Sequence, residues 1–305
     1  MKIVKSGILA SIQSKPNFGH QWVGISPSGA ADLFSFKILN LILGNQSDEP
    51  CIEFHFPAIM VQFEEDCTFG ISGADFNPFL DTKPLRNLEI IFAKKGQVLS
   101  FRQRKSGFRA YFSVKGGFES NLSEIIPGKI ISPGINLSLK SKTFHFTKIG
   151  LNNRYFEDKT NSKTIRFVPG NEYFELDDSS CQIINYESFE MSKNSNRMGI
   201  RLMGSNLKLQ KYKEIISNPV SKGTIQLLPD GGLVVLMSDG QVTGGYPRLG
   251  FVSSIDIDVL AQKSPGEQVF FKAITLEESR QLILDRNIFF KKLRAAINLK
   301  IKTNA

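Results

Sequence analysis

Residues 222–250 read KGTIQLLPDGGLVVLMSDGQVTGGYPRLG, and this stretch decides the fold that we expect for the chain. Two short runs rich in Ile, Leu and Val, at 224–228 and 233–237, are separated by a Pro-Asp-Gly-Gly turn. Runs of this length that are bounded by turn residues are typical of β-strands. The stretch therefore predicts a strand, a tight turn and a second strand.

The same pattern extends outward along most of the chain. Further short, mainly apolar runs between turn signals are IMVQF (59–63), EIIFA (89–93), QVLSF (97–101), AYFSV (110–114), TIRFV (164–168) and QVFF (268–271). Helical periodicity is confined to a few places, chiefly residues 32–43 and a helix that opens at Thr275 and runs to about Ile297. Thr275 and Glu278 have the spacing of a capping box. We therefore expect a mainly β chain with a few helices.

The C-terminal helix carries an apolar stripe that has to be buried. Its positions are Leu276, Ile283, Phe290, Leu293 and Ile297. We expect this stripe to pack on the chain's own second domain, and docking on a partner protein is the alternative.

A polar stretch without periodicity, NNRYFEDKTNSK at 152–163, is the best candidate for a domain boundary. A turn followed by Gln-Val and a Phe-ending strand occurs on each side of it, at 94–101 and 264–271. This similarity hints at two related β-barrel halves. The alternative is that a turn followed by a strand, which is a common local structure, arose twice without internal duplication of the sequence. We predict a first subdomain at 1–152, a linker at 153–163 and a second subdomain at 164–305, which includes the helix and a basic tail.

The charge distribution argues against several classes of partner. The chain holds 38 Lys and Arg against 29 Asp and Glu, a net charge of +9, of which six charges lie in the last 20 residues. A nucleic-acid groove needs basic residues spread over one folded face, so we expect no nucleic-acid partner.

The sequence has no apolar run of 18 residues and no secretory leader pattern. Its three cysteines lack metal-ligand spacing, so we expect a cytoplasmic protein without a metal site or membrane contact.

The deciding stretch also supplies the first candidate site residues. Asp239 and Gln241 follow the second strand, two positions apart, and on an extended chain they point to the same side. The turn at Gly244 and Gly245 lets the backbone approach a ligand closely. Together these residues predict the floor of a polar pocket. The alternative is a tight hairpin with ordinary surface side chains.

Two further candidates lie outside that stretch. Asp75 follows a Ser-Gly-Ala turn at the end of an expected strand, where it either orients a ligand or caps the next turn. Arg197 and Arg201 flank a glycine, an arrangement suited to a carboxylate or phosphate and equally to a surface cluster. The sequence shows no Walker A, dinucleotide-binding or zinc-protease motif.

Taken together, several blocks resemble the biotin-dependent carboxyltransferase / KipA family, which is also known as allophanate hydrolase subunit 2 or as the C subunit of 5-oxoprolinase. The matching blocks are GILASIQ (7–13), SPSGAADLFSFKILNLILGN (26–45), SGADF (72–76), AYFSVKGGF (110–118), NRMGIRL (196–202) and the whole of 223–250. The last block is the most specific. The chain departs from the family pattern at 14–19, where Ser-Lys-Pro-Asn-Phe-Gly replaces an Asp-x-Gly-Arg stretch, and at 121–136, where an arginine-containing block is shortened.

The resemblance implies two cyclophilin-like β-barrel subdomains and a role as the C subunit of an ATP-dependent 5-oxoprolinase. In such an enzyme the chain works with a KipI-like B subunit, together with an A subunit. The complex opens the lactam of 5-oxoproline to glutamate with ATP as cofactor, and we expect the chain to be inactive alone. The site residues are then expected to be catalytic Asp239 and Gln241, with substrate-binding Gln226, Tyr246, Arg197, Gly244, Gly245 and Asp75.

Two other functions stay open under the same resemblance. One is a biotin-dependent carboxyltransferase subunit that acts on urea or a similar small amide. This activity needs separate biotin-carrying partners, because the chain has no Met-Lys-Met biotinylation motif. The other is a KipA-like regulatory binding module.

Overall fold

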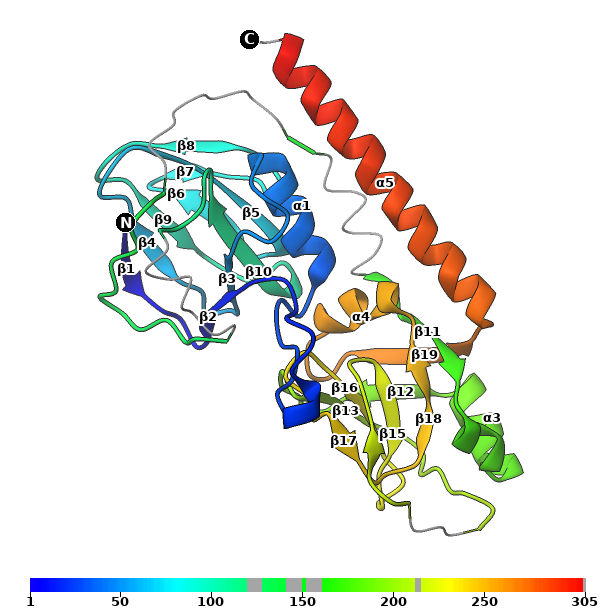
Figure 1. Ribbon diagram of the computed structural model, residues 1–305. Coiled ribbons are helices and arrows are strands. Elements are labelled where there is room, and N and C mark those ends of the chain that lie inside the picture. The colour runs from blue at the N-terminus through cyan, green and yellow to red at the C-terminus, as the bar shows by residue number, and fades with distance from the viewer. Residues whose placement is uncertain (120–127, 141–149, 152–160, 212–214, 304–305) are drawn as a thin grey trace. The chain divides into compact units, whose positions relative to one another are not determined.

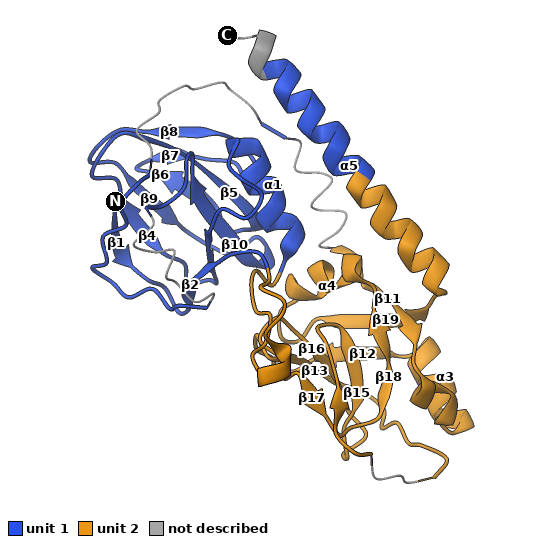
Figure 2. Cartoon of the chain, in the orientation of Figure 1, with its two compact units in different colours: residues 1–15, 32–160, 288–305 blue, residues 16–31, 161–287 orange. Residues whose placement is uncertain are grey.

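The computed structural model describes residues 1–119, 128–140, 150–151, 161–211 and 215–303. The chain forms two compact units, shown in Figure 2. Unit 1 comprises residues 1–15, 32–160 and 288–305, and unit 2 comprises residues 16–31 and 161–287. This division differs from the expected one in two segments, 16–31 and 288–305, each of which belongs with the other half. Of the expected linker at 153–163, only residues 161–163 are described.

Unit 1 is built from two antiparallel sheets (Figure 1). One sheet has the strand order β1 (Lys2–Lys5), β4 (Met60–Gln62), β9 (Val98–Phe101), β6 (Pro78–Leu80) and β7 (Lys83–Pro84). The other has the order β2 (Ala10–Gln13), β3 (Cys51–Phe54), β10 (Ser106–Val114), β5 (Cys67–Asp75) and β8 (Ile91–Ala93). Residues of these strands, and residues that directly follow β4 and β5, enclose an aromatic-rich core that includes Phe54, Phe63, Phe69, Phe76 and Phe112.

Helix α1 (Leu33–Leu43) lies on strands β5 and β10 of unit 1. Its N-terminus is capped by Asp32, whose carboxylate accepts from the backbone N–H of Ser35 at 2.9 Å. It ends at Gly44, which has a φ of 71°. The helix predicted over 32–43 is thus confirmed.

Unit 2 contains a closed barrel of seven strands. The strand order around it is β11 (Thr164–Pro169), β18 (Arg248–Val252), β15 (Thr224–Leu227), β16 (Leu233–Leu236), β13 (Gly199–Met203), β12 (Ser188–Met191) and β19 (Gln268–Ala273), and β19 closes the barrel by pairing in parallel with β11. The hairpin predicted from 222–250 is β15 and β16, with Ile225 opposite Val235. A separate two-stranded ribbon joins β14 (Asn218–Pro219) to β17 (Thr243–Gly244).

Short helices complete unit 2. They are η1 (Gln21–Val23), η3 (Asn171–Glu175), α3 (Asp178–Tyr186) and α4 (Ser254–Ala261). The prediction of a mainly β chain is confirmed, since the described ranges hold only four α-helices, α1, α3, α4 and the C-terminal α5. None of the helices in those ranges is long and apolar enough to cross a membrane.

Helix α5 (Leu276–Thr303) begins at the predicted capping box. Thr275 Oγ1 accepts from Glu278 N at 3.1 Å, and Glu278 Oε2 accepts from Thr275 N at 2.7 Å. The helix runs six residues past the expected end at Ile297. Ile297 is buried, whereas Leu276 is 49% exposed and so does not belong to the buried stripe.

Candidate functional site

An ion pair between Arg197 and Asp239 lies at the centre of the candidate site, in unit 2. Arg197 is in the loop before β13, and Asp239 is in the turn after β16. The guanidinium is bidentate, because Nε donates to Asp239 Oδ2 at 2.7 Å and Nη2 donates to Oδ1 at 3.0 Å. The side chain of Arg197 is 11% exposed and that of Asp239 is 31% exposed. A planar fork of this kind fixes the orientation of a carboxylate that still reaches solvent.

Ser28 is the third member of this cluster. Its hydroxyl donates to Asp239 Oδ1 at 2.5 Å. Ser28 has a φ of 50°, a conformation that is uncommon for a residue other than glycine. The next carbonyl, Gly29 O, accepts from Arg197 Nη2 at 2.7 Å. The loop at 26–29 therefore contacts both members of the ion pair, the Asp239 carboxylate through Ser28 and the Arg197 guanidinium through Gly29.

The N-terminal segment 16–31 is fastened to unit 2 by further hydrogen bonds. Ser26 Oγ donates to the carbonyl of Ser238 at 2.8 Å. Lys222 Nζ donates to the carbonyl of Ala31 at 3.0 Å. These contacts explain why the segment belongs to unit 2, although it precedes most of unit 1 in the sequence.

A second group of predicted residues surrounds Gly244 in β17. Gln226 is fully buried in β15, and its Nε2 has no hydrogen-bond partner among the described residues. A Cβ atom at Gly244 would lie 2.5 Å from Gln226 Nε2 and 3.1 Å from Gln241 Nε2. Only glycine allows the two amides to approach the backbone this closely. The two amides thus flank one glycine.

Gly245 and Tyr246 lie at the edge of a cavity of about 650 Å³. The cavity is mostly apolar, and its other lining residues are Leu207, Lys208, Leu209, Ile215, Ile216, Leu227, Leu228, Pro229 and Pro247. Tyr246 is 41% exposed. The side chain of Tyr246 is therefore accessible to a molecule that enters the cavity.

The predicted residues fall into separate groups. Asp239 lies in the turn 238–239 rather than on an extended strand, so the argument that placed it on the same side as Gln241 does not hold. Asp75 belongs to unit 1, where its Oδ1 accepts from Asn77 N at 2.7 Å and closes a turn. The capping role that the sequence left open for Asp75 is therefore present.

Ser28 was missed by the sequence analysis. The sequence signal for Ser28 is the Ser-Pro-Ser-Gly turn at 26–29. Serine hydroxyls in tight turns commonly form hydrogen bonds to nearby backbone groups. Within the described ranges, no three His, Cys, Asp or Glu side chains are grouped so as to hold a metal ion.

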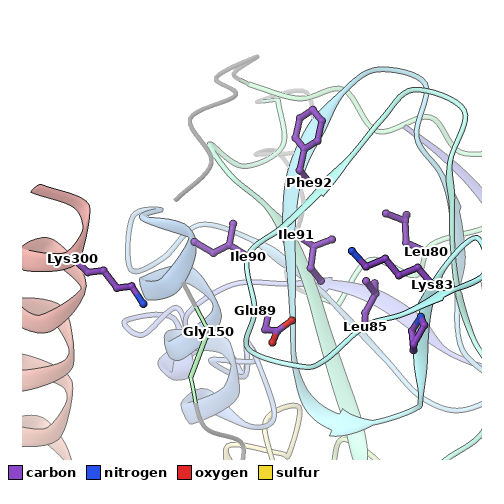
Figure 3. Close-up of a pocket in the computed structure, with 10 residues that line it drawn as sticks. Leu80, Lys83, Leu85, Glu89, Ile90, Ile91, Phe92, Gly150 and Lys300 are labelled. Atoms are coloured by element: carbon purple, nitrogen blue, oxygen red, sulfur yellow. The ribbon is translucent and has the colours of Figure 1, made fainter. Parts of the chain in front are cut away.

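Unit 1 has a cavity of its own, of about 450 Å³ (Figure 3). Its lining is largely apolar and includes Leu85, Ile91 and Phe92, and three charged side chains, Lys83, Glu89 and Lys300, also line it. None of the predicted site residues lines this cavity.

Comparison with known proteins gives consistent matches over nearly the whole chain. A sequence profile described as "Carboxyltransferase domain, subdomain A and B" matches residues 23–273. The chain is 30% identical to the C subunit of 5-oxoprolinase from Escherichia coli (strain K12), over 96% of this chain and 97% of that protein. It is also 30% identical to the corresponding 5-oxoprolinase protein of Haemophilus influenzae, over 95% and 96% respectively.

A solved structure has the same fold. The crystal structure of the Kluyveromyces lactis urea amidolyase matches with a TM-score of 0.85 and 21% sequence identity, over 96% of this chain and 20% of that one. At this sequence identity, the match shows that the two proteins share a fold.

Proposed function

We propose that this chain, which belongs to the carboxyltransferase domain family of subdomains A and B, is the C subunit of an ATP-dependent 5-oxoprolinase. The observation that carries the proposal is the correspondence with two bacterial 5-oxoprolinase proteins over nearly the full length of each sequence. Both relatives are named as subunits, which supports a complex. We propose that its other members are an A subunit, and a KipI-like B subunit.

The proposed reaction is the hydrolysis of a lactam. Water adds to the ring carbonyl carbon, the C–N bond breaks, and the ring nitrogen leaves as an amine with a proton from the attacking water, which gives glutamate. The amide is stable, so we propose that its opening is coupled to the hydrolysis of ATP to ADP and phosphate, which consumes a second water and makes the ring carbonyl more electrophilic. The chain has no glycine-rich phosphate cradle of the Walker type, so we assign ATP binding to the complex and no step of it to this chain.

Within this proposal Asp239 is the acceptor for a proton or an N–H group. Arg197 and Ser28 hold its carboxylate in one orientation, and its partial exposure leaves an edge for a small amide. The exposed amide of Gln241 belongs to the second group of residues, around Gly244, and we propose it as a separate contact to the substrate rather than as a partner of Asp239. Gln226 is too deeply buried to meet the substrate unless the segment around Gly244 moves.

The test is reconstitution with the cognate A and B subunits. We expect ATP-dependent release of glutamate from 5-oxoproline by the three proteins together. Asp239→Asn should lower the rate by about 100-fold while leaving the melting temperature within a few degrees of the parent. The matched control is Asp230→Asn, because Asp230 is an exposed aspartate that pairs with Arg201 outside the site. Full activity of Asp239→Asn would exclude Asp239 from the site.

A second candidate function is carboxyl transfer, which is favoured by the description of the matching family. It requires a biotin carrier and a biotin carboxylase as separate chains. In a parallel assay with carboxylated biotin and urea, formation of carboxylated urea without any glutamate release from 5-oxoproline would replace the first proposal by this one.

A further inference from the structure

We propose that the outer face of strands β15 and β18 carries a binding site for the amide group of a small molecule, formed by Gln226, Arg248 and Glu172 and covered by the ribbon of β14 and β17. The proposal rests on the proposed function for the identity of the amide, which is the lactam of 5-oxoproline. All of the residues that carry it belong to unit 2.

The three side chains meet on one face of the barrel. Gln226 and Arg248 are directly opposite one another in the antiparallel pair of β15 and β18. Their chain neighbours Ile225 and Leu249 belong to the buried core of the barrel. Because successive side chains of a strand point to opposite faces, Gln226 and Arg248 both lie on the outer face. Glu172, in η3, reaches the same place, since its Oε1 accepts from Arg248 Nη2 at 3.3 Å.

Each of these side chains has a buried polar atom that has no hydrogen-bond partner among the described residues. The atoms are Gln226 Nε2, Arg248 Nε and Glu172 Oε2. Gln226 is 1% exposed and Glu172 is 6% exposed. A buried polar atom without a partner costs free energy, and native proteins contain few of them. A ligand that pairs with all three atoms removes this cost when it binds.

The three atoms specify the chemistry of the ligand. The N–H groups of Gln226 and Arg248 are donors, and the carboxylate oxygen of Glu172 is an acceptor. An amide carries the complementary groups, namely a carbonyl oxygen that accepts up to two N–H bonds and an N–H that donates to a carboxylate. A carboxylate or phosphate ligand has no N–H to donate and is repelled by the charge of Glu172. The site therefore selects a neutral amide.

A ribbon that is separate from the barrel covers Gln226. Gly244 of β17 lies so close that a Cβ atom there would be 2.5 Å from Gln226 Nε2. The ribbon pairs only β14 with β17 and joins no barrel strand. The buried core cluster of unit 2 includes none of its described residues, 215–220 and 241–247. Segments with few buried apolar contacts open at low cost in free energy, so the ribbon is the part that moves to admit a ligand.

The cavity of about 650 Å³ provides the approach to this site. Leu227 and Pro247 line it, and they are the chain neighbours of Gln226 and Arg248. The cavity thus extends to within one residue of each donor. Its mostly apolar lining suits the carbon ring of a lactam, while the amide end of the ring meets the polar atoms.

Gln226→Met is the first test, because it replaces the amide by an apolar side chain of similar length. We expect the melting temperature of the full chain to rise by about 2–4 °C, since a buried N–H without a partner is removed. We expect the affinity for 5-oxoproline to fall by about tenfold or more. Affinity is measured by isothermal titration calorimetry, on the chain alone and on its complex with the cognate A and B subunits without ATP.

The matched control is Gln268→Met, at an exposed glutamine of the same barrel in β19, which should change neither quantity. A second variant, Arg248→Lys, keeps a cation beside Glu172 but removes the Nε–H group, and it should weaken binding by about fivefold or more. The ligand control is cyclopentanecarboxylate, which has the five-membered ring and the carboxylate but no amide. It should bind at least about tenfold more weakly than 5-oxoproline.

Thiol labelling tests the movement of the ribbon. In a Cys181→Ser background, which removes the half-buried native thiol, we compare Gln226→Cys with Ile225→Cys. Both positions are buried, but only the first lies under the ribbon. We expect a disulfide reagent to label Gln226→Cys about tenfold faster or more. Equally slow labelling of the two variants would overturn the movable cover.

These measurements separate the site from the proposed function. Glutamate release by the three proteins, with equal binding of 5-oxoproline to wild type, Gln226→Met and Arg248→Lys, would overturn the site and leave the function standing. Binding of urea that depends on Gln226, without glutamate release from 5-oxoproline, would support the site and favour carboxyl transfer. Binding of neither amide to the chain or the complex, or equal binding of cyclopentanecarboxylate, would overturn the site.

Discussion

At the scale of single residues, the Arg197–Asp239 pair holds together three segments that are distant in sequence. Removing the guanidinium leaves a partly buried carboxylate without its counter-ion and also frees the carbonyl of Gly29. We expect Arg197→Ala to lower the free energy of unfolding by about 2 kcal/mol, measured by urea denaturation.

The comparison for this variant is Arg201→Ala. Arg201 pairs with Asp230, and the two side chains are 41% and 56% exposed. Exposed pairs contribute little, so the expected loss is at most about 0.5 kcal/mol. Equal losses of unfolding free energy in the two variants would show that the Arg197–Asp239 pair contributes no more to stability than the exposed Arg201–Asp230 pair.

A second prediction concerns the three thiols. Burial raises the pKa of Cys51 far above the ordinary value, and it raises the pKa of Cys67 to about 12. The pKa of Cys181 is also raised by burial, but this side chain is only half-buried. Because the thiolate is the reactive form, we expect a disulfide reagent at pH 8 to react only with Cys181 in the folded chain. In denaturant all three cysteines should react, and rapid modification of Cys51 in the native state would contradict this.

At the scale of elements, the capping box of helix α5 gives a pH-dependent prediction. The backbone N–H of Thr275 donates to Glu278 and lowers the pKa of this carboxyl. Since the pKa is lower in the folded chain, the stabilisation is present above the unfolded pKa and is lost as the pH falls through the folded value. We expect Glu278→Ala to lower the melting temperature at pH 7, and the difference from wild type to shrink below about pH 4. A difference that grows in acid would refute this.

Truncations test how the same helix is held. The helix contributes the Arg286–Asp258 ion pair, the contacts of Phe289 and Phe290 with Phe34 and the buried Ile297. We expect a chain that ends at Ile274 to melt at a clearly lower temperature in calorimetry. A chain that ends at Ile297 should melt within a degree or two of the full chain. If the chain that ends at Ile274 melts at the same temperature as the full chain but no longer binds the other subunits, the helix is a docking element instead.

At the scale of the whole molecule, the proposed function predicts that the chain is inactive alone. Purified free of its partners, it should release neither phosphate from ATP nor glutamate from 5-oxoproline above the buffer background. Addition of the cognate A and B subunits should restore both. Sustained turnover by the partner-free chain would contradict the assignment of ATP binding to the complex.

Much of the fold follows from local sequence patterns. The hairpin of β15 and β16, helix α1 and the capping box at Thr275 were all predicted and are all present. Each depends on residues within a few positions of one another, where propensity and spacing act directly. The candidate site was predicted only in part. Asp239 and Arg197 were named separately, and the ion pair between them was not foreseen.

The sequence by itself determined that this chain is mainly β, where its first and last long helices begin, and which family it resembles. The tertiary structure alone decided that residues 16–31 belong to unit 2, that Ser28 meets Asp239 across 211 positions, and that the guanidinium of Arg197 binds Asp239 and Gly29. The physical reason is that backbone propensities and apolar periodicity act over a few residues. Which distant polar groups satisfy one another is fixed only once the path of the chain has brought them together.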